Sequence, residues 1–160
     1  MAVPDAILDT NAADALMALA LDEARAASTH DDVPIGAVVA RVSDGEVLAR
    51  RHNERELRGD PTAHAEVLAL RDAAAALGSW RLDGCVLVCT LEPCPMCAGA
   101  CVAARLPIVV FGAADAKAGA LGSLYHLGAD PRLNHEVAVV RDVRAEESAV
   151  LLREFFESHR

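Results

Sequence analysis

The chain has 160 residues, of which 53% are hydrophobic, and its 24 acidic residues outnumber its 15 lysines and arginines, giving a net charge of -9. A chain of this length buries one sizeable core and is too short for two ordinary domains, so we expect a single domain over residues 1–160. The acidic balance argues against a broadly basic nucleic-acid surface but leaves room for a local basic strip.

The charge pattern and the cysteines exclude two further classes of protein. Charged residues interrupt the longest apolar stretches, which excludes a membrane span. Residues 1–5 have neither a basic region nor an apolar secretory segment, and the five cysteines are an odd number. We therefore expect a cytoplasmic protein whose reduced thiols are free to bind metal.

The amino-terminal part of the chain predicts a helix followed by a hairpin. Residues 10–28 have the apolar spacing of an amphipathic helix, with Thr10 or Asn11 available as its cap. Residues 35–42 and 46–50 show the β-branched, alternating pattern of strands. An Asp-Gly pair between the two segments predicts that they form an antiparallel hairpin.

The next predicted element is a helix over residues 62–77. Pro61 introduces this helix and Gly78 is positioned to end it. His64 and Glu66 are expected in its first turns, two residues apart.

A strand-helix-strand unit follows. Residues 85–90 form an apolar run suited to a buried strand, residues 95–104 predict a helix, and residues 108–111 predict a second strand that lies parallel to the first. Cys94 and Cys97 are three residues apart, which places both sulfurs on one helical face. The positive end of the helix dipole there favours the thiolate form.

The carboxyl-terminal part of the chain predicts a long loop, a strand and a helix. Residues 112–133 are rich in Gly and Ala and are expected to form a loop at the substrate site, with a helical turn near residues 123–127. Residues 136–143 show the alternation of apolar and polar residues that is typical of a strand. In residues 145–158 the apolar residues have the spacing of a helix. The chain is therefore of the α/β class. In such sheets, ligands bind beyond the carboxyl ends of strands. His64 with Glu66, and Cys94 with Cys97, fall at such positions.

His64, Cys94 and Cys97 supply one imidazole and two thiolates, the donor set of an open zinc site whose fourth position holds water. Glu66 is close enough in sequence to reach such a water molecule and carry its protons. The pattern His-x-Glu with Pro-Cys-x-x-Cys is the known signature of zinc deaminases. We therefore predict a zinc-dependent enzyme with Glu66 as its catalytic residue.

The remaining cysteines leave an alternative open. A structural zinc site needs four protein ligands, and Cys85, Cys89 or Cys101 would supply the fourth. The Cys-x-x-Cys spacing is also found in redox pairs. Because Cys85 and Cys89 lie in an apolar strand and Cys101 lies in an Ala-rich helix, we expect these three to be small buried hydrophobic residues.

Basic and aromatic residues give weaker indications of an RNA-binding surface. A basic strip precedes the histidine motif, and Lys117, the one lysine of the chain, follows the cysteine motif. These charges either contact RNA or are solvated surface charges. The aromatic residues are expected in the core, with base stacking by one phenylalanine as the alternative. The strip comprises Arg50, Arg51, Arg55 and Arg58, and the aromatic set comprises Trp80, Phe111, Phe155 and Phe156.

Four segments extend the pattern beyond the zinc motif: DVPIGA at 32–37, DPTAHAE at 60–66, LEPCPMCAG at 91–99 and the Gly-rich stretch at 112–124. With them the chain resembles the bacterial tRNA-specific adenosine deaminases of the cytidine deaminase-like superfamily. The resemblance spans nearly the whole chain. It implies a three-layer α/β/α fold, a mixed five-stranded sheet flanked by helices, and a homodimer whose subunits share the binding surface.

The reaction implied by this resemblance converts the wobble adenosine of a tRNA anticodon, expected to be that of an arginine tRNA, into inosine. One Zn2+ per subunit would activate a water molecule for attack on C6 of adenine, and Glu66 would move protons to N1 and to the departing ammonia. The partner would be the anticodon stem-loop, whose loop bases are already unpaired.

The same resemblance implies a set of substrate contacts. Asn53 would hydrogen-bond the flipped nucleoside, with Asn134 as a second candidate. The surface that binds the anticodon loop would include Asp115, Lys117, Ser123 and Phe156. The alternative interpretations are an Asn in a turn, ordinary loop charges and a core phenylalanine.

Two other functions use the same zinc residues. A deaminase of a free nucleobase such as guanine or cytosine would need every zinc residue but no RNA-binding surface. A non-catalytic structural zinc module would need four protein ligands and no proton carrier.

Overall fold

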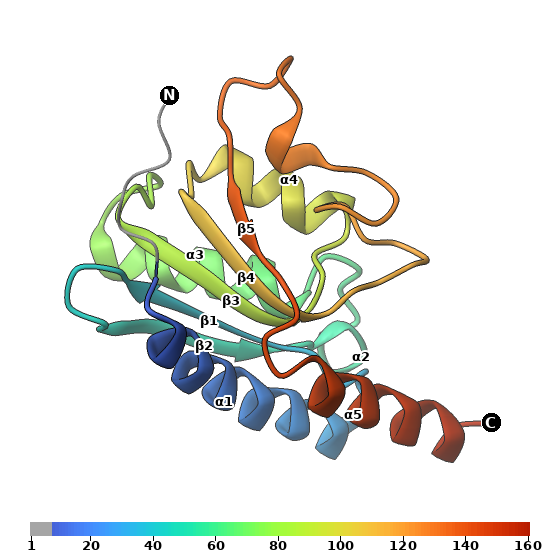
Figure 1. Ribbon diagram of the computed structural model, residues 1–160. Helices are drawn as coiled ribbons and strands as arrows, with labels where there is room; N and C mark the ends of the chain where they lie inside the picture. Colours follow the sequence, from blue (N-terminus) through green and yellow to red (C-terminus); the bar gives the residue numbers. More distant parts are fainter. Residues whose placement is uncertain (1–7) are drawn as a thin grey trace.

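The computed structural model describes residues 8–160, so the expectation for residues 1–5 lies outside the described part. A five-stranded sheet with strand order β2-β1-β3-β4-β5 forms the centre of the molecule (Figure 1). β1 pairs antiparallel with both β2 and β3, whereas β3, β4 and β5 run parallel, which confirms the expected mixed sheet. The strands are β1 Gly36–Arg41, β2 Val47–His52, β3 Cys85–Leu91, β4 Ile108–Ala113 and β5 Ala138–Val140.

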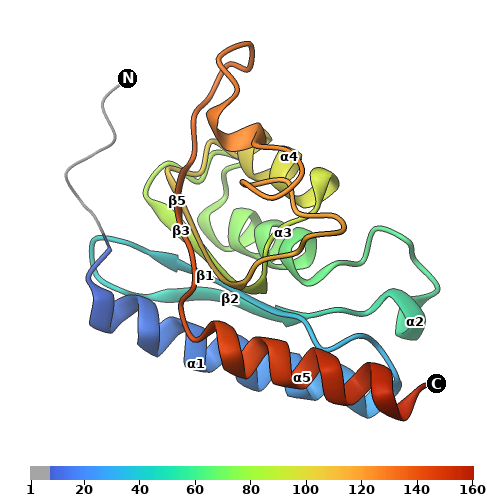
Figure 2. The ribbon, with the colours of Figure 1, turned by 45° about the vertical axis from the view of Figure 1, so that its right-hand side comes forward.

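Helices cover both faces of the sheet. α1 (Thr10–Ala27) and α5 (Ala145–Ser158) lie side by side on one face, and α3 (Ala65–Leu77) and α4 (Pro95–Ala103) lie on the other (Figures 1 and 2). This arrangement confirms the three-layer α/β/α fold. Within residues 8–160, none of the helices has the length and apolar character needed to cross a membrane.

α1 packs closely on β1 through a buried face spaced every three or four residues. Its cap is the side chain of Asp9, which accepts a hydrogen bond from the Asn11 N–H at 2.9 Å, so the expected cap at Thr10 or Asn11 is wrong by one or two residues. A Cβ atom at Gly36 would overlap the carbonyl oxygen of Ala20, so glycine is required where the helix crosses the strand. The buried face comprises Ala13, Leu16, Met17, Ala20, Leu21, Ala24 and Ala27.

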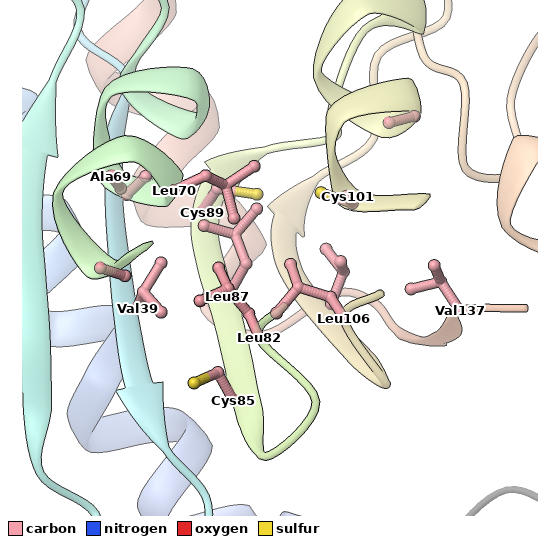
Figure 3. Packing of buried hydrophobic residues seen from close by; sticks show 14 of the residues in the cluster. Val39, Ala69, Leu70, Leu82, Cys85, Leu87, Cys89, Cys101, Leu106 and Val137 are labelled. Carbon is pink, nitrogen blue, oxygen red and sulfur yellow. The ribbon is translucent and has the colours of Figure 1, made fainter. Parts of the chain in front are cut away.

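The central strand β3 contributes side chains to two separate cores, because successive residues of a strand point to opposite faces. Val86 and Val88 pack toward α1, whereas Leu87 and Cys89 pack toward α3 and α4. Figure 3 shows Leu87, and the sulfur of Cys89 directed toward that of Cys101 on α4. Cys85, Cys89 and Cys101 are all buried, as the sequence indicated.

The helix expected over residues 62–77 begins at Ala65 instead, so His64 is its N-cap residue and not a residue of its first turn. Residues 60–64 form a turn in which Asp60 accepts hydrogen bonds from the N–H and hydroxyl of Thr62, both at 2.8 Å. A local side-chain acceptor of this kind competes with helix formation. The short helix α2 (Arg55–Arg58) was not predicted, because four residues show no apolar period.

The segment after β4 also differs from the prediction. The expected helical turn at residues 123–127 is instead a 3-10 turn, η2 (Leu127–Ala129), and a second one, η1 (Ser28–His30), follows α1. The strand expected over residues 136–143 is limited to β5, since it pairs with β4 through three residues. The terminal helix occupies the predicted range.

The carboxyl ends of β2, β3 and β4 meet at one edge of the sheet, because β1 is antiparallel to its neighbours on both sides. α3 and α4 both begin at this edge. The motif histidine and the motif cysteines therefore lie where α/β sheets place their ligands.

Candidate active site

The structure brings His64, Cys94 and Cys97 together. The Nδ1 atom of His64 lies 3.7 Å from Sγ of Cys94 and 3.5 Å from Sγ of Cys97. Zinc–sulfur and zinc–nitrogen bonds of about 2.3 and 2.1 Å at a tetrahedral angle would place nitrogen and sulfur about 3.6 Å apart. The three donor atoms therefore fit a zinc ion.

Two helix starts position these side chains. His64 is the N-cap residue of α3, and Cys94 is the N-cap residue of α4, with Pro95 in the first turn and Cys97 two residues further on. Proline suits the first turn of a helix because the N–H it lacks would have no helical partner there. The free backbone N–H groups at both starts favour negative charge, which stabilises thiolates.

The two thiols differ in acidity. A hydrogen bond with Cys97 and the nearby His64 ring lower the pKa of the Cys94 thiol to about 4. The hydrogen bond with Cys94, together with burial, raises the pKa of Cys97. Zinc binds thiolates, so zinc binding would displace any proton that the two thiols carry.

Within residues 8–160, no fourth His, Cys, Asp or Glu joins the three donor atoms, which lie within 4.8 Å of one another. Cys101 and Cys89 are buried in the core next to α4, and burial raises the pKa of both thiols. The donor set is thus three, as in open catalytic zinc sites, and not four, as in closed structural ones.

Glu66 lies in the first turn of α3 and is 5% exposed. Its burial raises the pKa of its carboxyl group. The side chain faces a hollow of about 200 Å³ that it shares with His64. The other lining residues are Val33, Ile35, Asn53, Arg55, Ala65 and Phe156.

Asn53 follows β2 directly and is buried at this hollow. Its side-chain amide donates to the carbonyl of Val33 at 3.3 Å, and its carbonyl oxygen accepts from the N–H of Arg55 at 3.2 Å. These bonds fix the side chain between two loops. The structure thus places the predicted nucleoside contact beside the predicted metal ligands.

Asp32 holds α2 against this edge of the hollow and has no counterpart among the sequence-predicted site residues. Its buried carboxylate accepts from the N–H groups of Glu56 at 2.7 Å and Leu57 at 3.1 Å, and its Oδ2 lies 2.7 Å from Nδ1 of His30. An aspartate beside an apolar VPIGA segment was the available signal, but the two N–H groups that it binds on α2 lie 24 and 25 residues away in sequence.

Most of the predicted basic strip is neutralised by carboxylates. Arg51 pairs with Glu54 and Asp72, Arg58 pairs with Glu54, and Arg50 lies 3.6 Å from Glu23. Arg55 has no carboxylate within ion-pair distance in the described part of the chain, and it lines the hollow beside His64. The strip is therefore largely a solvated ion-pair network, with Arg55 as the exception.

The four aromatic residues differ in burial, and Phe155 is half-buried. Phe111 is fully buried, as expected of a core residue. The core expectation is wrong for Trp80 and Phe156, whose exposed fractions are 61% and 53%. Phe156 lies on α5 and lines the hollow, which agrees with the alternative that one phenylalanine faces the substrate.

Three further predicted contacts, Asp115, Lys117 and Ser123, lie on the loop that follows β4. Lys117 is exposed, and Asp115 Oδ1 accepts from the N–H groups of Lys117 and Ala118 at 3.0 and 3.2 Å. The hydroxyl of Ser123 donates to Glu92 at 2.5 Å. Burial would raise the pKa of Glu92, but hydrogen bonds from Ser123, Asp115 and Leu121 outweigh it, and the pKa is lowered.

Asn134 is not brought to the hollow that holds Glu66. It is exposed and lines a separate depression of about 320 Å³ with Asp130, His135 and Glu136. Its role in substrate binding stays a prediction.

Comparisons with known proteins agree with this geometry. The sequence profile of MafB19-like deaminases matches residues 11–160. The tRNA-specific adenosine deaminase of Bacillus subtilis is 49% identical over 141 residues, which cover 88% of this chain and 86% of that protein. A solved structure from a study of A-to-I editing by tRNA:A34 deaminases at the wobble position is 44% identical with a TM-score of 0.82, covering 86% of this chain and 99% of that one.

A guanine deaminase from Nitrosomonas europaea is a more distant neighbour. It is 28% identical, with a TM-score of 0.75, and the match covers 89% of this chain and 83% of that one. The fold is thus shared by enzymes with different substrates. The tRNA-specific adenosine deaminases of Bacillus subtilis and Agrobacterium fabrum are 49% and 46% identical to this chain. This chain is a member of the tRNA-specific adenosine deaminase family, within the MafB19-like deaminases.

Proposed function

We propose that this chain is a zinc-dependent hydrolase that converts the wobble adenosine of a tRNA anticodon loop into inosine. The family resemblance implies an arginine tRNA as the substrate. The observation that carries the proposal is the buried carboxyl group of Glu66, which shares a hollow with the ring of His64. A buried acid beside a three-donor metal site suits proton transfer during hydrolysis.

His64, Cys94 and Cys97 would hold the zinc ion. Zinc bound there would lower the pKa of a water molecule from about 15.7 to about 7, so that hydroxide is available at neutral pH. The protein residues would then do the remaining work of binding, orientation and proton transfer.

Glu66 would accept a proton from the attacking water and deliver it to N1 of adenine. The same carboxylate would then take the proton of the hydroxyl group added at C6 and deliver it to the amino group. The C6–N bond would break as the C6 carbonyl forms and ammonia leaves, so Glu66 acts first as a base and then as an acid. Its enclosure in the hollow limits access by other water molecules.

Asn53 would orient the nucleoside. Its side chain is already held by Val33 and Arg55, so little conformational entropy is lost when substrate binds. Phe156 would provide an apolar surface against the base, and Arg55, Asp115 and Lys117 would face the phosphates and sugars of the loop. An anticodon loop suits this site because its bases need not be extracted from a duplex.

We also propose that the active form is a homodimer. The outer surfaces of α3 and α4 carry an apolar depression of about 330 Å³ that includes Leu70, Ala74, Ala103 and the exposed ring of Trp80. Small residues allow a second copy to approach closely, and exposed apolar patches of this kind mark contact surfaces. Light scattering of an Ala103→Glu variant should show a monomer where the unchanged protein is a dimer.

The substrate and the unpaired thiols together suggest the cytoplasm as the site of action, since tRNA is present there and thiols remain reduced.

A substrate comparison tests the proposed function. The purified protein is incubated with an anticodon stem-loop carrying adenosine at the wobble position, with the same stem-loop carrying guanosine there, and with free guanine and free cytosine. We expect inosine in the first RNA and no turnover of the free bases. Turnover of guanine or cytosine without inosine would instead support a nucleobase deaminase, the activity of the Nitrosomonas europaea neighbour.

A further inference from the structure

Glu92 is a buried carboxylate to which the proposed mechanism assigns no chemical step. It lies between β3 and the Cys94–Cys97 motif, and it is 2% exposed. Four donors point at it. Oε1 accepts from the N–H of Asp115 at 3.1 Å and from the hydroxyl of Ser123 at 2.5 Å, and Oε2 accepts from the N–H groups of Leu121 and Ser123, each at 3.1 Å.

The loop after β4 closes around this carboxylate. The Glu92 N–H donates to the carbonyl of Ala113 at 2.8 Å, and the Ala120 N–H donates to the carbonyl of Pro93 at 2.9 Å. A Cβ atom at Gly119 would overlap the Glu92 carboxyl group, so the loop backbone lies directly against it. Residues 115–123 are therefore held to the segment that carries the two motif cysteines.

This loop carries two of the proposed RNA contacts. Asp115 and Lys117 lie in a turn that begins at the residue whose N–H is bound by Glu92. Lys117 is exposed, so the position of its ammonium group depends on how the backbone of the turn is held. The Glu92 carboxylate is the side-chain acceptor that fixes both ends of residues 115–123.

We infer that Glu92 is a positioning residue for the RNA substrate: it holds residues 115–123 so that Asp115 and Lys117 face the anticodon loop. The inference rests on the proposed function. Glu92 would thereby tie the placement of the RNA to the segment that supplies the metal ligands Cys94 and Cys97.

Substitution by glutamine separates this role from simple volume filling. All four partners of Glu92 are donors, so a carboxylate, which only accepts, satisfies them. Glutamine has nearly the same shape, but its amide would direct N–H groups at N–H donors. Because these facing N–H groups would be buried without acceptors, the loop would be displaced, whereas the glutamine side chain would still fill the same volume.

The first measurement is the steady-state kinetics of Glu92→Gln on the adenosine stem-loop. We expect KM to rise by about tenfold, because a buried donor loses its acceptor, with kcat within about twofold of the unchanged protein. Zinc content should be unchanged. Glu46→Gln, at the opposite edge of the sheet, is the matched control and should leave KM unchanged because surface ion pairs contribute little.

A double-mutant cycle with Lys117→Ala tests whether Glu92 acts through the loop. Lys117→Ala should raise KM and reduce the slope of log KM against log salt by about one, because one phosphate contact is lost. If Glu92 positions Lys117, the Glu92→Gln variant already has the reduced salt slope, and adding Lys117→Ala changes KM little further. Fully additive effects with an unchanged slope in Glu92→Gln would overturn the inference.

Ser123→Ala provides a second variant in case Glu92→Gln fails to fold. It removes one hydrogen bond to Glu92, and we expect faster amide hydrogen exchange across residues 115–123 in the RNA-free protein, which loss of a direct RNA contact would not produce. Unchanged exchange would contradict the inference. An unchanged protein that makes no inosine contradicts the proposed function, whereas inosine formation with a normal KM in Glu92→Gln contradicts this inference alone.

Discussion

The floor of the site, formed by His64, Glu66, Cys94 and Cys97, differs from the rim that we propose for it, formed by Asn53, residues 115–123 and Phe156. Two short motifs at two helix starts supply the whole floor. Three segments far apart in the sequence supply the rim, and contacts with other parts of the chain hold Asn53 and residues 115–123. Local structure thus fixes each half of the floor, and the tertiary fold brings the two halves together across 30 and 33 residues. The floor suits chemistry, whereas the rim, which depends on tertiary contacts, suits recognition.

This difference predicts that substitutions in the floor abolish activity, whereas substitutions in the rim reduce it only in part. The largest effect is expected for Cys97→Ser. Replacing one of three metal ligands should release zinc and reduce activity to background. Metal content measured by atomic spectrometry, together with inosine formation, checks this expectation.

Cys101→Ala is the control for the metal-ligand variant. Cys101 lies one helical turn beyond Cys97 and outside the three-donor cluster, so zinc should stay at one per chain. Loss of zinc from Cys101→Ala, or full zinc retention in Cys97→Ser, would show that the ligand set is wrong.

The second effect concerns the proton carrier. Glu66→Gln should lower kcat by about 10²–10⁴-fold, the usual contribution of a positioned acid or base. Zinc content and RNA affinity should be retained, since Glu66 lies outside the donor cluster. Single-turnover kinetics with the stem-loop measures the change, and near-normal turnover would remove Glu66 from the mechanism.

A smaller effect is expected at the rim, for Phe156→Ala. Its ring is 53% exposed and lines the hollow, so its loss should remove stacking worth about 1–3 kcal/mol. KM for the stem-loop should rise by about tenfold, while thermal stability changes little because the ring is not in the core. A loss of stability with an unchanged KM would instead indicate a packing role.

The smallest effect is expected for Asn134→Ala. The side chain is exposed in a depression separate from the hollow that holds Glu66. We expect KM and kcat to stay within about twofold of the unchanged protein, as for most exposed substitutions. A tenfold loss of kcat would show that the rim extends to this depression and that Asn134 belongs to it.

The chemistry of the floor could be predicted from two short motifs. The spacing of Cys94 to Cys97 is a local property, because residues three positions apart lie on one helical face. His64 and Glu66 are two residues apart at the start of α3. Burial of the central strands also followed from their apolar runs. The same local reasoning placed the terminal helix at its observed range.

The contacts that hold the rim in place became visible only in the folded structure. Glu92 accepts hydrogen bonds from donors 23 to 31 residues away in sequence, and Asp32 from donors 24 and 25 residues away. The helical and strand periods of a sequence do not reveal contacts over such separations. The orientation of Phe156 depended on how α5 lies beside α1. Hydrogen-bond satisfaction of buried carboxylates is a property of the assembled chain, so the residues that position the substrate surface emerged from contacts and not from pattern.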